Sequence, residues 1–492
     1  MCLLPHLGSK KFKIVIGLII IALYLAHSIG RAFTKLPVCD EAWYGQPALN
    51  LATGRGMVTT VLETAGTPRH GLQQHTYWEM PFYLVAQVPW YKVFHFGLLQ
   101  MRLFSITCGI IFLISWFVFV RVFFQSQVIA LVASALLAVD FEIVNVSVTG
   151  RSDVMCAALG AAAFASYMVL RRRHFKTALL LGNALVAGSG MTHPNGLIYL
   201  VVLAILVFSF DRKRLAWIHL LIVGAPYLVG AALWGAYILQ APADFVAQFG
   251  GSASHRLGGL TLPWFAVKGE FLRYRNAYGF RDFTLTLRSA KGLVLLAYVA
   301  GVAGVLFSRK DTPSRLWLKI TAVVFVMMVF YESAKQEWYL IHILPFFAAL
   351  LGVCVVKNWQ GRAMARWAMI AGLAMVLLLE TSLTVWLIHK DDYSHRFLPA
   401  VNFLKAHLGQ NSMIMGSSEL GFELPFEQVI DDYRLGFYSH KNPQFIVVEP
   451  NYQGAFLDFV EAEPQVYQHI QRLLRTEYRI VYDDGYYSIY TR

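Results

Sequence analysis

Long apolar runs separated by short polar turns recur from residue 14 to about residue 389 of the chain. Several of these runs approach ~20 residues, the length that a helix needs to cross a lipid bilayer. The first run follows three lysines and lacks a small-residue cleavage site, so we expect it to stay in place as a spanning helix. The pattern predicts eleven spans: 14–30, 101–120, 127–147, 154–170, 177–192, 195–210, 215–239, 290–307, 318–333, 339–356 and 367–389.

Lysine and arginine gather in short turns between these runs, such as "RRRHFK" (171–176) and "DRKR" (211–214). Because basic turns stay on the cytoplasmic side, the long loops 31–100 and 240–289 and the C-terminus are expected on the outer face, with the N-terminus inside. The apolar stretch 80–99 would move every later basic turn outside if it crossed. We therefore expect it to form an interfacial helix.

Composition agrees with this class of protein, since 57% of the 492 residues are hydrophobic and only 14% are charged. The formal net charge of +13 sits mainly in the short turns, so it indicates membrane topology rather than nucleic-acid binding. The five cysteines are scattered and have no CxxC spacing, which gives neither a disulfide framework nor a zinc signature.

The last hundred residues, 391–492, have a different pattern, with spaced acids and short alternating stretches. The pair Asp484-Gly485 between two such stretches predicts a β-hairpin. The segments 397–408 and 465–476 have the apolar spacing of helices. We expect a small α/β domain outside the membrane.

Two adjacent carboxylates, Asp40 and Glu41, stand directly after the first span, where the first outer loop begins. The simplest interpretation is that these two acids only mark where the chain leaves the membrane and enters water. Other outer segments add more ionisable residues: His70, His75 and Glu79 in the same loop, "TGRSD" (149–153) and "MTHPNG" (191–196). Ionisable residues gathered at one edge of a membrane are candidates for function.

Four segments in order carry a family resemblance: "CDEAWYGQPALNL" (39–51), "YWEMPFYLV" (77–85), "GRSDVMCAALGAAAFASYMVLRRR" (150–173) and "KQEWYLIHILPFFAAL" (335–350). They resemble the acidic, aromatic-Glu-Lys-Pro-Pro, Arg-x-Asp and Lys/Tyr-Pro motifs of the protein O-mannosyltransferase and lipid A aminoarabinose transferase superfamily. The resemblance implies the GT-C fold: a polytopic α-helical membrane protein with about eleven transmembrane helices in 1–390 and a small C-terminal α/β extramembrane domain in 391–492.

The resemblance implies a membrane glycosyltransferase that moves a sugar, with inversion, from a polyprenyl-phosphate-linked donor to a lipid, glycan or protein acceptor on the outer face. We expect the plasma (inner) membrane as the setting, because the sequence shows no retention signal, with the active face periplasmic or extracellular. The acceptor hydroxyl must lose a proton, so a carboxylate is needed as a base. Asp40 matches the acidic position of the motif and is our choice. Glu41 either orients the reacting groups or faces water.

The leaving phosphate needs a cation or a metal ion. In the superfamily, the Glu at the position of Glu79 is associated with a divalent metal in some members. The Lys that follows it is associated with the phosphate, but this chain has Met80 in place of that Lys. The candidates for donor binding are Arg151, Arg256, Arg281, Lys335 and Tyr339. Glu79 and His255 are the candidate metal ligands, although no local motif such as HExxH supports them.

Two other functional classes remain open. A transporter or flippase of lipid-linked sugars predicts broken helices and ionisable residues near the middle of the membrane. Here most acids lie at the outer ends of spans or in the C-terminal tail, which favours the enzyme. Asp140, Glu142 and Glu380, near span ends, are exceptions. A structural subunit would leave Asp40 dispensable. His193 reads as a helix-terminating residue, and Asp153 as a partner of Arg151.

Overall fold

The computed structural model describes residues 10–67, 69–250, 263–279, 289–307, 311–332, 334–359, 363–409 and 412–492. The helices are α1 (Lys10–Thr34), α2 (Cys39–Ala52), α3 (Pro81–Phe94), α4 (Leu98–Phe124), α5 (Gln127–Val139), α6 (Phe141–Ser147), α7 (Ser152–Leu170), α8 (Phe175–Thr192), α9 (Gly196–Asp211), α10 (Trp217–Ile238), α12 (Pro263–Ala277), α13 (Gly292–Phe307), α14 (Thr312–Phe330), α15 (Leu344–Asn358), α16 (Ala363–Lys390), α17 (Leu398–His407), α18 (Pro450–Ala462) and α19 (Pro464–Arg472). The strands are β1 (Ile414–Met415), β2 (Val429–Ile430), β3 (Phe445–Val448), β4 (Arg479–Asp483) and β5 (Ser488–Thr491).

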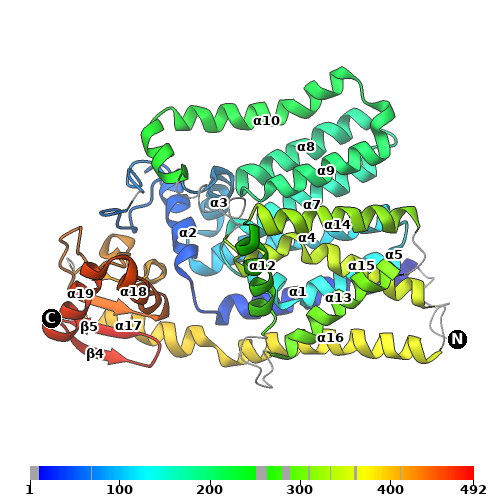
Figure 1. Ribbon diagram of the computed structural model, residues 1–492. Coiled ribbons are helices and arrows are strands. Elements are labelled where there is room, and N and C mark those ends of the chain that lie inside the picture. Colours follow the sequence, from blue (N-terminus) through cyan, green and yellow to red (C-terminus); the bar gives the residue numbers. More distant parts are fainter. Residues whose placement is uncertain are drawn as a thin grey trace.

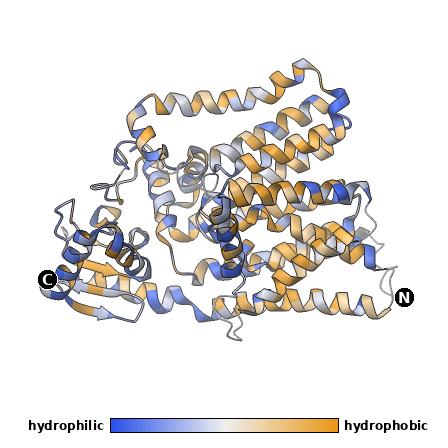
Figure 2. Cartoon of the chain, viewed as in Figure 1, coloured by the Kyte–Doolittle hydropathy of each residue, from blue (hydrophilic) through white to orange (hydrophobic). Residues whose placement is uncertain are grey.

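The long helices form a bundle, with the N-terminus at one end and the C-terminal sheet at the other (Figure 1). Helix α7 packs between α4 and α8, α15 packs against α5 and α13, and α10 lies at the edge against α8. The bundle is apolar along its length, and polar residues gather at its ends and in the C-terminal part (Figure 2). In the described part of the chain, six helices are long and apolar enough to cross a membrane. The chain is therefore a multi-pass membrane protein.

Each of the eleven predicted spans contains a helix, but several of these helices are short. Helices α8, α9, α13 and α15 have 18, 16, 16 and 15 residues, which cover roughly 22 to 27 Å at 1.5 Å per residue. Helix α3 has only 14 residues and packs on α2 and α8, so its length agrees with the expected interfacial helix rather than a further span.

The predicted span 127–147 is not one helix, because the chain bends by 64° between α5 and α6. Side chains satisfy the backbone groups at this break. Asp140 accepts hydrogen bonds from the N–H groups of Glu142 and Ile143, and Glu380 accepts one from Phe141 N–H at 2.8 Å. Asp140, Glu142 and Glu380 are buried inside the bundle, which a position near span ends did not suggest. They stabilise a broken helix.

The C-terminal part contains a five-stranded mixed sheet with the order β2-β1-β3-β5-β4. Strand β1 is parallel to β2 and β3, whereas β5 is antiparallel to β3 and β4. The hairpin expected at Asp484-Gly485 is present, and Gly485 has the positive φ of +78° that its turn requires. Helices α17 and α19 lie where helical spacing predicted them. Strand β2 and helix α18 were not predicted.

This sheet shares its hydrophobic core with α2 and the loop that follows it. Ala42, Val61, Leu62 and Leu72 are buried in one cluster with side chains from α17 and from strands β1, β2, β3 and β5. The loop also pairs with the chain just after β2, where Leu62 and Asp431 form a parallel bridge. The C-terminal part is thus packed onto the end of the bundle opposite the start of α1, and the helices α2 and α12 run across that same end (Figure 1).

Candidate active site

A cavity of about 820 Å³ lies where one end of the bundle meets the C-terminal part. Its walls come from the first turns of α2, the loop 62–79, Arg151, the segment 334–339 and the segment 431–434. Segments that are hundreds of residues apart in the sequence therefore line one open cavity. The cavity contains Asp40, Glu79, Arg151 and Tyr339 from the residues predicted as candidates.

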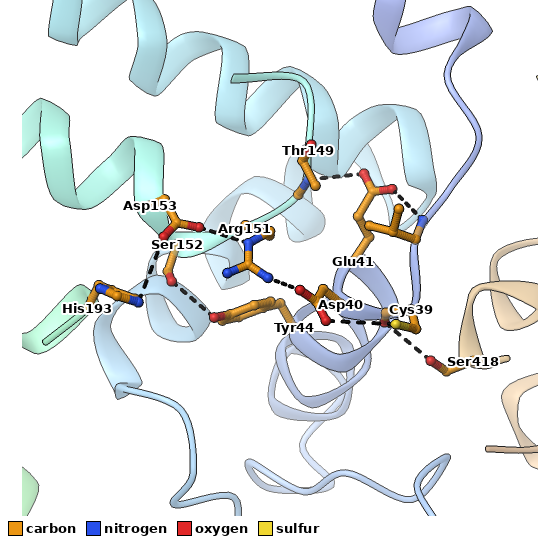
Figure 3. Close-up of polar contacts among 12 residues, drawn as sticks. Cys39, Asp40, Glu41, Tyr44, Thr149, Arg151, Ser152, Asp153, His193 and Ser418 are labelled. Carbon is orange, nitrogen blue, oxygen red and sulfur yellow. Dashed lines mark hydrogen bonds and ion pairs between the residues drawn. The ribbon is translucent and has the colours of Figure 1, made fainter. Parts of the chain in front are cut away.

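Asp40 lies in the first turn of α2 and points into this cavity (Figure 3). Acidic residues suit this position because the N-terminus of a helix carries partial positive charge. The carboxylate Oδ2 contacts the guanidinium Nη1 of Arg151, and Oδ1 lies 3.8 Å from the Cys39 thiol. The Asp40 side chain is 23% exposed. A thiol is a weak donor, so a substrate hydroxyl can take its place at Oδ1.

Arg151 joins Asp40 to a second, fully buried carboxylate. Its Nε donates to Asp153 Oδ2 at 2.9 Å, while its guanidinium lies 5.1 Å from the ring centre of Trp338. Asp153 Oδ1 in turn lies 3.8 Å from His193 Nε2, so four ionisable groups form a row from the cavity into the bundle (Figure 3). The expected pairing of Asp153 with Arg151 is present. The row fixes the guanidinium that orients Asp40.

Glu41, the next residue, has a different environment. Arg102 donates to its two carboxylate oxygens from Nε and Nη2, both at 2.8 Å, and the backbone N–H groups of Gly150 and Val38 also donate to it. Its side chain is fully buried. Burial alone would raise the pKa of Glu41, but the Arg102 guanidinium and these hydrogen bonds lower it below its ordinary value. The alternative in which Glu41 faces water is therefore wrong.

The other predicted residues lie at varying distances from Asp40. Tyr339 lines the cavity, and its ring centre lies 5.2 Å from that of His193. Glu79 also lines the cavity. Lys335 is directed away, because its ammonium donates to the carbonyls of Met328 and Val329 and lies 3.2 Å from Glu270. Three predicted residues lie outside the described residues: His255, Arg256 and Arg281.

Among the described residues, one buried group has the spacing to hold a metal ion; it is formed by Cys156, His193 and His342. These residues fit a metal poorly. The Nδ1 atom of His193 accepts a hydrogen bond from the N–H of Asn195 at 3.1 Å, which places the ring proton on Nε2, toward Asp153. The predicted pair of Glu79 and His255 has only its first member in the described residues.

The C-terminal part supplies a wall that the sequence did not reveal. Asp431, Asp432, Tyr433 and Arg434 follow β2 and line the cavity. Asp431 is held by Trp43 Nε1 at 3.1 Å and by the N–H of Ser418 and the hydroxyl of Tyr452. The run "DDYR" was a visible signal, since three charged residues and a tyrosine directly follow a short apolar stretch.

Carboxyl groups near this wall are unusually basic. Burial raises the pKa of Asp431 and of Glu419, and it raises the pKa of Glu449 to about 6. Their mutual repulsion adds to the effect on Glu419. Perturbed carboxyl groups beside a cavity are typical of functional sites.

A second space, an apolar groove of about 830 Å³, lies between α3, α8 and α10. Pro81, Phe82 and Val85 of α3 line one side, and Val229, Leu233 and Trp234 of α10 line the other. The cavity and the groove are close along the chain, because Trp78 and Glu79 line the first and Pro81 the second.

Comparison with protein families matches residues 80–234 to the model described as dolichyl-phosphate-mannose-protein mannosyltransferase. Among solved structures, ArnT from Cupriavidus metallidurans bound to undecaprenyl phosphate has a TM-score of 0.61 at 13% identity, with 98% of each chain covered. The chain has the GT-C glycosyltransferase fold. The resemblance that the sequence motifs indicated is thereby confirmed.

Two archaeal structures with the same fold come from Archaeoglobus fulgidus. Its oligosaccharyltransferase in the apo form has a TM-score of 0.59 at 11% identity, over 94% of this chain and 72% of that chain. The oligosaccharyltransferase AglB from the same organism, in complex with an inhibitory peptide and a dolichol-phosphate, has a TM-score of 0.54 at 12% identity, over 93% of this chain and 71% of that chain. Comparison with curated protein sequences gives no match.

Proposed function

We propose that the protein transfers a sugar from a polyprenyl-phosphate carrier to an acceptor hydroxyl, with inversion at the anomeric carbon. The observation that carries this proposal is the position of Asp40, at a cavity that the C-terminal segment 431–434 also lines. An apolar groove begins at Pro81, close along the chain to Glu79 of the cavity. A water-borne acceptor and a lipid-borne donor can meet at such a place. The GT-C fold, and the undecaprenyl phosphate and dolichol-phosphate bound in the ArnT and AglB structures, support the same donor class.

Asp40 acts as the base in this proposal. An acceptor hydroxyl that donates to Asp40 Oδ1 becomes a stronger nucleophile as it attacks the anomeric carbon. Arg151 holds the other oxygen and is itself fixed by Asp153, so the carboxylate does not need to reorient during the reaction. Glu41 serves the same step indirectly, because it anchors the start of α2 and the backbone at Gly150.

The apolar groove suits the polyprenyl chain. It is lined almost wholly by aliphatic and aromatic side chains, and α10, which forms one side, exposes most of its surface to the membrane. A carrier lying there would place its phosphate near residues 78–81, at the edge of the cavity. We propose that the outer end of the bundle faces the periplasm or the cell exterior, in agreement with the basic turns at the other end.

Turnover by the purified protein tests the proposal. A panel of polyprenyl-phosphate monosaccharides is incubated with wild type, Asp40→Asn or Glu427→Gln, with host membrane extract as the source of acceptor. Glu427 is an exposed surface residue paired with Arg55, so its variant is a matched control. Release of polyprenyl phosphate by wild type and the control but not by Asp40→Asn supports the proposal. Equal release by all three, or none by wild type, contradicts it.

A flippase of lipid-linked sugars is the alternative that one observation favours, namely the broken helix at Asp140 with its buried carboxylates. However, these groups already have partners. Glu142 lies 2.9 Å from Lys291, the Asp140 carboxylate accepts from Tyr298, and Glu380 caps α6. These local contacts explain the break without transport, although Glu380 Oε1 has no hydrogen-bond partner among the described residues.

A further inference from the structure

We propose that Arg69 is the cation that binds the phosphate of the lipid-linked donor. This inference rests on the proposed function, which requires an anionic group in the cavity. Arg69 lies in the loop between α2 and α3, was not among the candidates drawn from the sequence, and lines the cavity together with Trp43 and Trp78.

Three arginines line the cavity in the described residues, and two of them are already neutralised. Arg151 is paired with both Asp40 and Asp153. Arg434 makes a two-pronged pair with Glu463, with contacts from 2.6 to 3.2 Å. By contrast, no carboxylate among the described residues lies within ion-pair distance of Arg69. An incoming anion would have to compete with two carboxylates at Arg151 and with a bidentate carboxylate at Arg434, but not at Arg69.

The surroundings of Arg69 prepare it for this role. Its guanidinium lies 4.6 Å from the ring centre of Trp78 and 6.0 Å from that of Trp43, and the two indole rings meet edge to face at 5.7 Å. Stacking on an indole ring fixes the plane of the guanidinium while leaving its N–H groups at the edge for an oxyanion. The loop backbone is also fixed, since the Arg69 N–H donates to Thr67 Oγ1.

The charge balance of the cavity makes an uncommitted cation necessary for an anionic ligand. Carboxylates outnumber arginines in its lining: Asp40, Glu63, Glu79, Asp431 and Asp432. A phosphate is repelled by such a surface unless it binds directly to a cation. Burial lowers the pKa of Arg69, and nearby Glu79 opposes that shift, but a guanidinium remains charged at neutral pH.

The position of Arg69 also fits the path of the lipid. It stacks on Trp78, three residues before Pro81, which begins α3 and lines the apolar groove. A phosphate on Arg69 would therefore stand where a chain in the groove ends. Arg69 lines the cavity that also contains Asp40.

Direct binding measures the role of Arg69 separately from catalysis. Detergent-purified wild type, Arg69→Gln, Arg69→Lys and Arg55→Gln are titrated with a short-chain polyprenyl phosphate, with the alcohol of the same chain, and with inorganic phosphate as a competitor. Arg55 is an exposed arginine paired with Glu427 and does not line the cavity, so Arg55→Gln controls for the loss of one positive charge. Thermal melting of each variant confirms that it is folded.

We expect Arg69→Gln to weaken polyprenyl-phosphate binding by roughly ten- to hundred-fold, the cost of losing charge-assisted hydrogen bonds. Arg69→Lys should lose less, because it keeps the charge but not the planar fork. Binding of the alcohol should be equal in all four proteins. Competition by inorganic phosphate in wild type that is lost in Arg69→Gln would assign the effect to the phosphate group rather than to the chain.

The outcomes separate this inference from the proposed function. If folded Arg69→Gln binds polyprenyl phosphate with the same affinity as wild type, the role of Arg69 is wrong, whatever the turnover of the sugar donor. Weaker binding by Arg69→Gln, in a protein that consumes no sugar donor, supports the phosphate site and contradicts the transferase. If wild type binds the phosphate and the alcohol equally, both proposals are wrong.

Discussion

Asp40 and Glu41 are neighbours in the first turn of α2, yet their surroundings are opposite. Glu41 is fully buried and receives hydrogen bonds from Arg102, Gly150 and Val38. Asp40 is partly exposed, borders a cavity and contacts one arginine and a thiol. Because consecutive helical residues point roughly 100° apart, one side chain enters the bundle while the other enters the cavity.

The difference shows how two neighbouring carboxylates of the same charge can have different roles, one structural and one open to a substrate. The pair of Glu41 with Arg102 is saturated by protein groups, so it has no capacity left for a substrate and fixes the helix instead. Asp40 keeps an oxygen facing the cavity, so it can accept a hydrogen bond from a substrate. Variants at the two carboxylates and at their partners test this difference, since each role predicts a different effect on stability or turnover.

The largest expected effect is on stability, from Arg102→Met. This change leaves the Glu41 carboxylate buried without its cation and frees the backbone carbonyls of Ala32, Lys35 and Leu36. Breaking a buried ion pair in this way costs about 3–5 kcal/mol. We expect a large fall in melting temperature in detergent, or failure to purify folded protein.

The double variant Arg102→Met with Glu41→Gln is the matched control. It removes the unpaired charge but not the lost carbonyl contacts, so part of the stability should return. A double variant no more stable than Arg102→Met alone would mean that the ion pair is not what stabilises this end of α2.

A smaller effect is expected on catalysis from Asp153→Asn, since Asp153 positions Arg151 without touching the substrate. Loss of the charge lets the guanidinium move, and a small misplacement of a reacting group costs up to about 100-fold in rate. We expect kcat to fall by roughly ten- to hundred-fold while the KM for the acceptor changes little. A fall in stability without a change in kcat would contradict a positioning role.

The contact between the C-terminal sheet and α2 should contribute about 1 kcal/mol at Trp43. Trp43→Phe removes the hydrogen bond from Nε1 to Asp431 and keeps the aromatic ring. The expected result is a slightly lower melting temperature and faster proteolysis after residue 390. Trp217→Phe, at an exposed tryptophan of α10, should change neither.

The smallest effect concerns pH. The pKa of Glu449 is raised by burial to about 6 in the folded protein, above the ordinary value of 4.5. The folded state therefore binds the extra proton first, and this contribution to stability is present below pH 4.5 and lost as pH rises through 6. Between pH 7.5 and 5.5 the gain is below about 1 kcal/mol. Melting curves of wild type should show this rise, and Glu449→Gln should show less of it.

The sequence predicted what local patterns determine. Apolar runs gave the positions of the bundle helices, and the motifs around Asp40 and Arg151 gave two groups that meet in the cavity. It could not show which way Glu41 points, because that depends on Arg102, 61 residues away. The charged run at 431–434 is visible in the sequence, but its place beside α2 is not, since Asp431 reaches Trp43 across 388 residues only when the C-terminal sheet packs there.

The break at Asp140 shows the same limit. The composition of 127–147 is that of one apolar span, and the bend depends on a carboxylate from α16 that satisfies the freed N–H of Phe141. Long-range polar contacts therefore determine where this helix breaks, which the hydropathy of the sequence does not show. Arg69 was missed for a related reason, because what sets it apart is the pairing of the other two cavity arginines in three dimensions.

The most direct test of the central claim compares Asp40→Asn with Glu41→Gln in one preparation, measuring turnover of the sugar donor per folded protein and the melting temperature of each. We predict that Asp40→Asn melts like wild type but loses at least roughly 100-fold in turnover. Glu41→Gln should melt lower, while its folded fraction keeps turnover within about ten-fold of wild type, since a lost buried pair acts on stability. If Asp40→Asn turns over the donor as fast as wild type, or if Glu41→Gln is stable but inactive, the assignment of a catalytic role to Asp40 and a structural role to Glu41 is contradicted.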